Sequence, residues 1–503
     1  MADWGAGYVT DVNYIPGYYV QQSPVHMVAA ARLVGIACDL PESEDEVHFL
    51  ELGCGLGLVS LILAAANPGW RVTGIDFNPA HIAAARAFAR QADIANAVFI
   101  EADLAGFAES AVADEVPQAD FVSIHGVWSW VSAAVRAGIV RLLRDKVRAG
   151  GIVHLSYNAL PGWQGRLGMQ RLVRIAGNAA QGRSDRRALA GFDILRGLHA
   201  AGARRLAGSG DIGALLERLA ELPVAYLAHE FMNAHWQPCF HADVAEALAA
   251  ARLEWIGSGD LLENFPELTL TEAQREIYNR IDDPFYRELV KDLCVERGLR
   301  HDLFVRGAQR LSAADRNAAL GEVALMATVS ADDFQYEIRM AEGKAELARD
   351  FYGAMAQALA AGPRTVAELL ALPEAAGRGD KAAELTGILI GTGQAAAMLR
   401  PGAPQAGPAA ALNRLLAEGF GRIEHRTTPL ALASTAIGGG LPASAFELFV
   451  QSRLAQGEDE RALETWVAAL GTELDAAAQQ QLRELFQRIV NRRVPIFRSA
   501  GVL

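Results

Sequence analysis

The sequence predicts an α/β protein built on a doubly wound, mostly parallel β-sheet, followed by a mainly helical C-terminal part. Two observations predict this fold. Short apolar segments alternate with helical segments of about 10 to 15 residues early in the chain, which is typical of a parallel sheet. After about residue 330 this alternation gives way to alanine-rich helical sequence. The 503 residues are enough for roughly three domains.

The expected sheet has seven strands. Five strands precede residue 160, at 47–52, 71–76, 97–102, 119–125 and 151–157, with helices at 24–38, 56–66, 79–92 and 133–147. Each strand is a short apolar run, and a helical segment separates it from the next strand. Two further strands, at 253–258 and 303–307, complete the sheet if helical insertions follow its fifth and sixth strands.

The C-terminal part is expected to resemble a winged helix. A strand-like segment at 333–340 precedes several helices, one of which opens on a capping box formed by Thr365 and Glu368. A further helix near 379–390 carries few basic residues, so DNA binding by this part is not expected. The segment 401–410 is rich in proline and glycine and predicts a linker or exposed loop.

Composition excludes several classes of protein. The chain has 46 Lys and Arg against 59 Asp and Glu, a net charge of −13, which argues against a nucleic-acid partner. Its four cysteines include no CxxC pair, which argues against a zinc ribbon or disulfide scaffold. The N-terminus lacks signal-peptide features, and the longest apolar stretch, 58–66, is too short for a membrane span. We therefore expect a soluble, cytoplasmic protein without a membrane partner; a homodimer stays open.

The strongest motif lies where the first strand turns into the first helix, in the segment 51–57, Glu-Leu-Gly-Cys-Gly-Leu-Gly. Its three glycines allow positive φ angles and close approach of a ligand to the backbone. Asp76 ends the second strand, where a carboxylate can accept hydrogen bonds from both ribose hydroxyls. Leu58 stands where a dinucleotide fingerprint requires glycine. A nucleoside with a short amino-acid tail, such as S-adenosylmethionine, therefore fits better than a dinucleotide.

Further cofactor contacts are expected at the ends of the next strands. Asp103 follows the third strand and would reach the adenine amino group, although a helix N-cap is the alternative for this residue. Phe77 either covers the adenine face or belongs to the core. The candidate cofactor-binding residues are Glu51, Gly53, Cys54, Gly55, Gly57, Asp76, Phe77, Asp103, Leu104 and His125.

Aromatic residues gather after the fourth and fifth strands, in the segments 125–131 and 156–163. Ligands of open α/β sheets bind outside the carboxyl ends of the strands, and a wall of rings beside a sulfonium suits a cationic acceptor. The alternative is that these rings anchor the helical insertion. The first 25 residues are also rich in tyrosine and form an arm that either packs on the body or covers a ligand.

The segment 229–241 contains three histidines and Cys239, and it invites interpretation as a metal site. It fails the HExxH pattern because position 233 is Asn, so one helix face lacks the second ligand. We expect no metal here, and instead a polar segment that covers the acceptor site.

The glycine turn, Asp76 and Asp103 resemble those of class I S-adenosylmethionine-dependent methyltransferases. The sequences HGVWSWV, SYNALPGW, YLAHEFMNAHWQPCF and FYRELVKDLCVERGLRHDLFVRG resemble methyltransferases that carry a methyltransferase regulatory domain, among them rickettsial protein-lysine methyltransferases that modify outer-membrane protein B. The similarity runs through about residues 10–340 and is weaker beyond. It implies a Rossmann-like seven-stranded sheet, S-adenosylmethionine as cofactor, and methyl transfer, most often to nitrogen.

The resemblance also implies a division of labour along the chain. Residues 1–160 would form the cofactor-binding core, 161–330 a regulatory or substrate insertion with the last core strands, and 331–503 the winged-helix-like domain. Because all nucleotide-binding motifs lie before residue 126, we expect residues beyond about 345 to be dispensable for cofactor binding but not for acceptor selection. The residues expected to line an acceptor channel are Tyr18, Trp128, Trp130, Tyr157, Asn158, Trp163, His235 and Trp236.

Three functions stay open at this point. Methylation of lysine in a protein is the first, and the alternative is a small-molecule N- or O-methyltransferase. A non-catalytic regulator with the same fold is the third, and the intact glycine turn with Asp76 argues against it.

Overall fold

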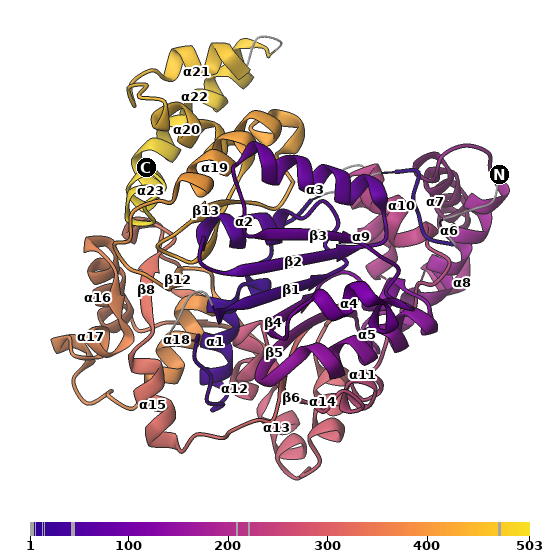
Figure 1. Ribbon diagram of the computed structural model, residues 1–503, viewed down its shortest axis with the longest axis horizontal. Helices are drawn as coiled ribbons and strands as arrows, with labels where there is room; N and C mark the ends of the chain where they lie inside the picture. The colour runs from indigo at the N-terminus through magenta and orange to yellow at the C-terminus, as the bar shows by residue number, and fades with distance from the viewer. Residues whose placement is uncertain are drawn as a thin grey trace.

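The computed structural model describes residues 5, 7–12, 14, 16–41, 46–207, 210–219, 222–470 and 474–503. A seven-stranded sheet lies at the centre, with the strand order β3-β2-β1-β4-β5-β7-β6 (Figure 1). Its strands are β1 (His48–Leu52), β2 (Arg71–Asp76), β3 (Ala97–Glu101), β4 (Ala119–Ile124), β5 (Val147–Asn158), β6 (Leu253–Ser258) and β7 (Leu299–Arg306). Strands β1 to β5 run parallel, and β7 is antiparallel to both β5 and β6. The predicted fold class is confirmed.

Helices cover both faces of this sheet. One face packs against α1 (Pro24–Leu33), α2 (Leu58–Ala66) and α3 (Pro79–Gln91), and the other against α4 (Ala111–Glu115), α5 (Ala133–Lys146) and α11 (His241–Ala249). The central strands β1 and β4 are buried along their whole length, as expected for a parallel sheet that is covered on both sides.

The first helix is shorter than predicted. It ends at Leu33 rather than near residue 38, because Gly35 adopts a φ of +79°. The Gly35 N–H donates to the Arg32 carbonyl, and the Ile36 N–H donates to the Ala31 carbonyl, so the chain turns out of the helix at this glycine. Strand β7 is longer than predicted because it pairs with β5 from Ile152 to Asn158, and β5 begins earlier than predicted, at Val147, which pairs with Ala119 of β4.

The helical insertion follows β5 and has a small hydrophobic core of its own. It comprises α6 (Leu167–Ala179), α7 (Ser184–Ala200), α8 (Arg204–Ala207), α9 (Gly210–Arg218) and α10 (Val224–Met232). A second insertion, between β6 and β7, contains α12 (Pro266–Thr269), α13 (Glu272–Asn279) and α14 (Pro284–Cys294). The predicted positions of these insertions match the structure.

The C-terminal part begins with α15 (Ala313–Gly321) and a three-stranded sheet of order β11-β8-β12. The strands of this sheet are β8 (Ala324–Ala327), β11 (Arg364–Thr365) and β12 (Ala395–Met398). Two separate two-stranded sheets are formed by β9 (Glu337–Met340) with β10 (Gly343–Glu346) and by β13 (Leu430–Ser434) with β14 (Gly439–Ala443). The predicted capping box of Thr365 and Glu368 is present. Strand β12 pairs with β8, which lies between α15 and the remaining helices of this part, and the winged-helix-like description stays a prediction.

Eight further helices complete the C-terminal part. They are α16 (Arg349–Ala361), α17 (Val366–Leu370), α18 (Ala382–Gly391), α19 (Gly407–Phe420), α20 (Ala445–Ala455), α21 (Leu463–Leu470), α22 (Ala476–Arg492) and α23 (Val494–Ser499). The predicted strand at 333–340 is shorter than expected, because residues 331–333 form a turn of 3-10 helix.

The C-terminal part packs directly on the glycine-turn helix. All nine residues of α2 are buried, and α19 and the β13–β14 hairpin cover this helix (Figure 1). The Asn67 side chain donates to the Gly438 carbonyl at 3.0 Å, and Arg400 donates to the Asn67 side chain at 2.8 Å. This packing argues against the expectation that residues beyond 345 are dispensable for cofactor binding.

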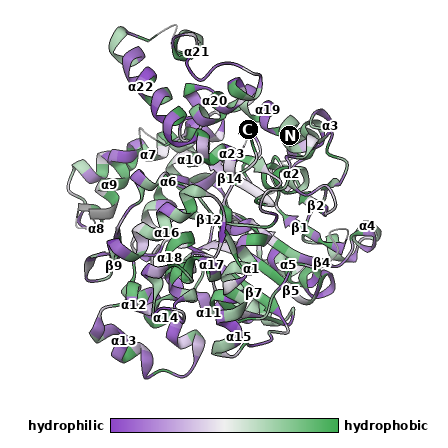
Figure 2. Ribbon diagram, turned by 90° about the vertical axis from the view of Figure 1, so that its left-hand side faces the viewer, coloured by the Kyte–Doolittle hydropathy of each residue, from purple (hydrophilic) through white to green (hydrophobic). Residues whose placement is uncertain are grey.

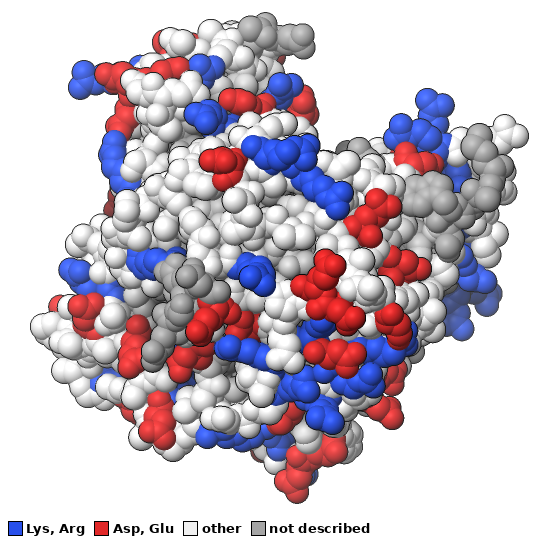
Figure 3. All heavy atoms as spheres, in the orientation of Figure 1, with Lys and Arg blue, Asp and Glu red and all other residues white. Residues whose placement is uncertain are grey.

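Polar and apolar residues are distributed as expected for this layered architecture. The peripheral helices α13 and α22 are mostly hydrophilic, whereas the strands and helices at the centre are mostly hydrophobic (Figure 2). On the face shown in Figure 3, basic and acidic side chains are interspersed. No helix in the described part of the chain is long and apolar enough to cross a membrane.

Candidate active site

The strand order places a binding crevice between β1 and β4. The chain connects β1 through β2 to β3 on one side of the sheet and then returns to β4 on the other side. At such a switch point, the loops that follow the two neighbouring strands diverge, and ligands bind in the crevice that they leave. The glycine turn follows β1, and the segment from His125 to Trp130 follows β4.

The three glycines of the turn have different structural roles. All have positive φ angles, +73° at Gly53, +53° at Gly55 and +75° at Gly57. A Cβ atom at Gly53 would lie 2.3 Å from the Val127 side chain, and one at Gly57 would lie 2.7 Å from the Phe99 ring. A Cβ at Gly55 would have no protein atom within 4 Å, so this residue faces open space. The turn therefore offers an open cradle at Gly55, which fits a ligand that approaches the backbone closely.

Asp76 is coupled directly to this turn. Its Oδ2 atom accepts a hydrogen bond from the Gly55 N–H at 2.9 Å, and its Oδ1 atom accepts one from the Asn78 N–H, also at 2.9 Å. The His81 Nδ1 atom also lies 3.3 Å from Oδ1, so Oδ2 is the oxygen that keeps a lone pair for a ribose hydroxyl. The observed geometry therefore fits the nucleoside end of S-adenosylmethionine.

Glu51 lies behind the turn and is buried. Its Oε2 atom accepts hydrogen bonds from the hydroxyl and the N–H of Ser60 at 2.5 and 3.2 Å, and its Oε1 atom accepts from Gln22 at 3.3 Å. Burial raises the pKa of Glu51 to about 7, although these hydrogen bonds favour the charged form. The neighbouring Cys54 thiol is buried as well, and burial raises its pKa well above the usual range.

The remaining cofactor candidates lie around the same edge of the sheet. Phe77 follows β2 and contacts the ring of Tyr8, with centroids 5.2 Å apart. Asp103 is exposed and accepts a hydrogen bond from the Ala105 N–H at 2.9 Å, whereas Leu104 is buried. His125 follows β4, and its ring packs against Tyr19 with centroids 4.1 Å apart.

The N-terminal arm crosses the site next to Phe77. Tyr8 lies between Phe77 and His235, 4.9 Å from the latter ring, and its hydroxyl accepts a hydrogen bond from the Ser132 N–H at 3.1 Å. The Ala234 N–H donates to the Gly7 carbonyl at 3.0 Å. The arm thus links the end of β2 with the helical insertion.

A buried carboxylate connects the ends of β4 and β5 with the helical insertion. Glu230, on α10, accepts hydrogen bonds from the Asn158 amide at 2.9 Å and from the Trp236 indole N–H at 3.1 Å. The Trp130 side chain forms a third hydrogen bond with the same carboxylate. Asn158 directly ends β5, and its N–H donates to the Ser129 hydroxyl at 2.8 Å. Three of the predicted acceptor residues thus converge on Glu230.

Tyr14 and Tyr226 lie near this carboxylate, and Tyr19 lies near both of these tyrosines. The residues Tyr14 and Tyr226 also reach the surface, with 44% and 36% exposed. Burial, as the largest cause, raises the pKa of all three phenols, so they are neutral near pH 7. Together with Trp130 and Trp236 they form what we call the Glu230 enclosure.

Three predicted acceptor residues do not reach the enclosure, and for them the structure corrects the expectation. Tyr157 is fully buried on the face of β5 opposite to His154 and Ser156, and its hydroxyl donates to Asp302 at 2.5 Å. Tyr18 is buried against the C-terminal hairpin, where its hydroxyl accepts from the Gly440 N–H at 2.8 Å.

Trp128 is the third such residue. It is buried within the hydrophobic core beneath the sheet and interacts with the Cys239 side chain there. Trp163 lies behind the enclosure, because it packs edge-on against Trp236 at 5.1 Å while its indole N–H donates to the Gly298 carbonyl. His235 belongs to the contact with the N-terminal arm.

The histidines of segment 229–241 point in different directions. His229 bonds to the Val12 carbonyl at 2.8 Å, and His241 bonds to Asp302 at 3.0 Å. A different histidine group, His125, His154 and His301, is the one group of potential metal ligands within the described residues. Its rings stack within 16° of parallel, and the His154 and His301 nitrogens are hydrogen-bonded to each other at 3.0 Å. Burial, as the main cause, holds the pKa values of His125 and His154 well below the usual range.

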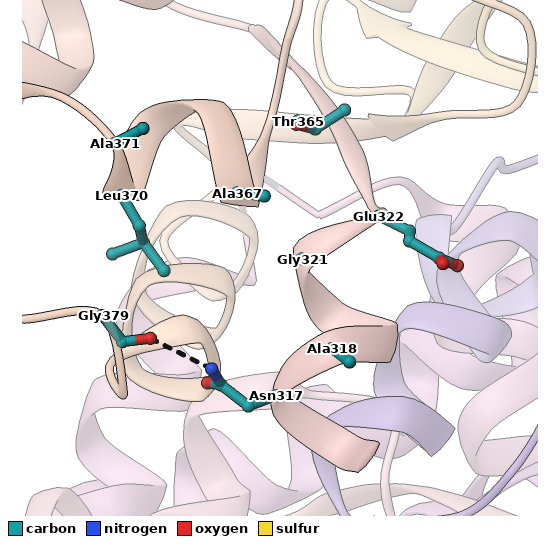
Figure 4. A pocket seen from close by; sticks show the side chains of 9 residues that line it. All are labelled: Asn317, Ala318, Gly321, Glu322, Thr365, Ala367, Leu370, Ala371 and Gly379. Carbon is teal, nitrogen blue, oxygen red and sulfur yellow. Dashed lines mark hydrogen bonds between the residues drawn. The ribbon is translucent and has the colours of Figure 1, made fainter. Parts of the chain in front are cut away.

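A surface hollow lies elsewhere, between α15 and α17 in the C-terminal part (Figure 4). Mostly small and apolar residues line it, together with Glu322 and with Asn317, whose amide donates to the Gly379 carbonyl at 3.0 Å. None of the candidate site residues contributes to this hollow, and it presents no group suited to methyl transfer.

Sequence reasoning missed the carboxylate at the centre of the enclosure. Glu230 lies in a segment that the sequence predicts to cover the acceptor site, but no role was assigned to this acid, and its neighbour on the arm, Tyr14, is separated from it by more than 200 residues. An acid within an otherwise apolar helical segment, Val224–Met232, was the available signal.

The crevice, the glycine cradle and the acidic residue after β2 together define a nucleoside-binding α/β enzyme of the S-adenosylmethionine-dependent methyltransferase class. Comparison with known families agrees. Residues 50–153 match a family described as a methyltransferase domain, and residues 223–306 match one described as a predicted methyltransferase regulatory domain.

Relatives and solved structures extend this comparison over most of the chain. An uncharacterized protein of Synechocystis sp. is 31% identical over 366 residues, which cover 73% of this chain and 71% of that protein. An uncharacterized protein of Rickettsia prowazekii is 31% identical over 34% of this chain and 30% of its own length. The structure of PKMT2 from Rickettsia typhi in complex with AdoHcy matches with a TM-score of 0.71 at 16% identity, covering 97% of this chain and 99% of that one.

The chain belongs to the S-adenosylmethionine-dependent methyltransferases that carry a methyltransferase regulatory domain. It is an enzyme, and its cofactor is S-adenosylmethionine.

Proposed function

We propose that this protein transfers a methyl group from S-adenosylmethionine to the side-chain amine of lysine in a protein. The observation that carries the proposal is the Glu230 enclosure at the carboxyl end of β4 and β5. Aromatic rings around a carboxylate favour a cationic amine, because the ring faces and the carboxylate both attract positive charge. A phenol or alcohol acceptor would gain less from such surroundings.

The cofactor half of the site follows from the turn and the second strand. Asp76 would hold the ribose hydroxyls, and the open cradle at Gly55 would take the chain that leads to the sulfonium. Phe77 and Asp103 would face the adenine. Glu51 and His125 would support the turn and the end of β4. When bound, S-adenosylmethionine supplies an electrophilic methyl group.

The chain's own residues would perform three tasks during the transfer. The enclosure would hold the acceptor nitrogen in line with the methyl carbon and the sulfur, since this alignment is the main requirement of a displacement reaction. Trp130, Trp236 and the arm tyrosines would exclude water from the acceptor. Desolvation by these rings would also lower the pKa of the acceptor amine and so increase its neutral, nucleophilic fraction.

A protein acceptor is proposed over a small molecule on the basis of whole-chain similarity. The fold of PKMT2 is shared across nearly the full length, including the insertion and the C-terminal part, and the sequence motifs resemble those of protein-lysine methyltransferases. On this proposal the cofactor is bound by residues 1–160. The acceptor is covered by residues 161–330, and residues 331–503 help to select it.

The experiment is transfer of a labelled methyl group to the proteins of a bacterial lysate. The protein is incubated with methyl-labelled S-adenosylmethionine and a lysate that contains both proteins and metabolites, and the products are separated by size. Acid hydrolysis of the protein fraction should release labelled Nε-methyl-lysine. Label confined to the small-molecule fraction would favour a small amine or hydroxyl compound as acceptor, and would overturn the proposal. The matched control is the Asp76→Asn variant, which should transfer little label to either fraction.

A further inference from the structure

We propose that Glu230 is the group that binds the acceptor ammonium and removes its proton before methyl transfer. This inference rests on the proposed function, because it requires an amine acceptor. It assigns a general base, which neither the family comparisons nor the sequence motifs identify.

The position of Glu230 is the first argument. Its carboxylate is held by Asn158, the last residue of β5, and by Trp130, which follows β4. These two strands are neighbours in the sheet, and β4 borders the cofactor crevice. Glu230 therefore lies over the edge of the sheet to which an acceptor must come in order to meet the methyl group.

The charge balance around Glu230 is the second argument. The side chain is buried, with 6% of the residue exposed, and its hydrogen-bond donors, Asn158, Trp236 and Trp130, are all neutral. In the described part of the chain, no Lys, Arg or His side chain forms an ion pair with Glu230, in contrast to the buried acids Glu288, Asp292 and Asp302. A buried carboxylate without a cation costs free energy, and an incoming ammonium would offset that cost.

The titration behaviour of Glu230 agrees with this role. Burial raises its pKa to about 7, because the three hydrogen bonds only partly compensate for lost solvation. The titratable groups nearest to it are the phenols of Tyr14 from the arm and of Tyr226 from α10 itself, and Tyr19 lies near both of these tyrosines; all three have raised pKa values. Arg166 and Arg218 lower the pKa of Tyr226 slightly by their positive charge. Glu230 is thus the group of this set that changes charge near neutral pH.

The other acids near the crevice are less suited to this task. Glu51 is enclosed by Ser60 and Gln22 behind the glycine turn, and Asp76 is engaged by the backbone N–H groups of Gly55 and Asn78. Both carboxylates are on the cofactor side of the site. Glu230 is the acid that the structure places among aromatic rings on the acceptor side.

A proton moves from the acceptor nitrogen to Glu230 before the methyl group is transferred. The acceptor Nζ–H bond breaks, its electron pair stays on nitrogen, and the proton forms an O–H bond with the Glu230 carboxylate. The neutral nitrogen then forms a bond to the methyl carbon, while the electrons of the carbon–sulfur bond go to sulfur. The product is a methylammonium and a neutral thioether, and Glu230 afterwards releases its proton to solvent. A nearby sulfonium and the surrounding rings lower the pKa of the ammonium and so reduce the difference between its pKa and that of Glu230.

The kinetic test compares two variants with opposite defects. Glu230→Gln keeps the shape and the hydrogen-bonding oxygen but removes the charge. Glu230→Asp keeps the charge but shortens the side chain. With a lysate protein as acceptor, the Gln variant should lose about 10²- to 10⁴-fold in kcat at pH 7.5, the usual contribution of a general base. The Asp variant should keep more activity, and its kcat should still rise with pH through an inflection near neutrality.

A high-pH measurement separates a base from a structural residue. Free lysine amine becomes neutral near its ordinary pKa of about 10.4, so the deficit of Glu230→Gln should shrink at least tenfold between pH 7.5 and pH 10. A deficit that is constant over this range, or a Gln variant with the activity and pH profile of the wild type, would overturn the assignment.

A second readout needs neither cofactor nor acceptor. The Trp130 and Trp236 indoles contact the Glu230 carboxylate, so protonation of Glu230 should change the tryptophan fluorescence of the free protein. The wild type should show a transition near pH 7 that is absent in Glu230→Gln and weakened in Trp236→Phe. No such transition in the wild type, or the same transition in the Gln variant, would contradict the proposal.

The two proposals fail in different ways. A labelled small amine as the sole product, with a pH dependence that Glu230→Gln abolishes, would overturn the lysine proposal and support Glu230 as the base. Labelled Nε-methyl-lysine with equal pH profiles in wild type and Gln variant would support the lysine proposal and overturn the role of Glu230.

Discussion

A methyl group added at Gly55 should block the cofactor and leave the fold intact. A Cβ at this residue would meet no protein atom within 4 Å, so Gly55→Ala creates no clash with the chain itself. Its φ of +53° lies in the left-handed region, which costs alanine about 1 to 2 kcal/mol of folding stability. The added methyl group would occupy the open side of the turn, where the cofactor is expected to pass.

The magnitude follows from the hydrogen bond between the Gly55 N–H and Asp76. To accommodate both the methyl group and the cofactor, the turn must move, and Asp76 then loses its position beneath the ribose. Loss of one charged hydrogen bond costs about 1.5 to 3 kcal/mol, which raises the Kd for S-adenosylmethionine by roughly 10- to 100-fold. Titration calorimetry measures this Kd, and denaturant unfolding measures the stability.

Gly150→Ala is the matched control. Gly150 also has a positive φ, +81°, and also faces open space, but it lies near the start of β5, at the opposite edge of the sheet. Both variants should lose similar stability, whereas only Gly55→Ala should weaken cofactor binding. An unchanged Kd in Gly55→Ala, or equal weakening in the two variants, would refute the proposed cradle.

Three further outcomes are expected. Tyr157→Phe should lower the free energy of unfolding by about 1.5 to 3 kcal/mol, because it removes the hydrogen bond to Asp302. Turnover per folded molecule should stay normal. A variant with a normal thermal melt and lost turnover would show that Tyr157 lines the acceptor channel. A chain that ends near residue 345 should lack a cooperative unfolding transition, because it exposes the side of α2 that α19 and the β13–β14 hairpin cover. A cooperative, cofactor-binding fragment would show that this packing is dispensable. Finally, the pKa of Glu230 rises from the ordinary 4.5 to about 7 in the folded protein. Between these two pH values the folded state holds a proton that the unfolded chain releases, so the stability of the wild type falls as the pH rises from about 4.5 to about 7. Glu230→Gln should remove that loss and gain about 3 kcal/mol relative to the wild type between pH 4 and pH 8, and a pH-independent difference would contradict the buried carboxylate.

The sheet and the cofactor turn could be predicted because their signals are local. Strands and helices alternate with distinct periodicities, and the glycine turn is a contiguous motif followed by Asp76 at a fixed distance. The end of the first helix was misjudged because a single glycine, Gly35, decides it through its backbone conformation.

The acceptor side could be predicted only in part, because it assembles from distant segments. Trp130 follows β4 and Asn158 ends β5, so both lie at the carboxyl ends of the strands, and sequence reasoning identified both. Successive residues of β5 point to opposite faces of the sheet, so Tyr157 lies in the core, where it bonds to Asp302 of β7, while Asn158 reaches Glu230. Tyr18 and Tyr19 are adjacent in sequence, yet the first packs on the C-terminal hairpin and the second on His125.

The most direct test of the proposed site is a crystal structure of the protein with S-adenosylhomocysteine, the demethylated form of the cofactor. We expect the ribose hydroxyls to bond to Asp76, the amino-acid tail to pass Gly55, and the sulfur to face the enclosure formed by Trp130, Trp236 and Glu230. In that arrangement the missing methyl group would point at the Glu230 carboxylate. A complex in which the ribose makes no contact with Asp76, or in which the sulfur faces away from the enclosure, would contradict it.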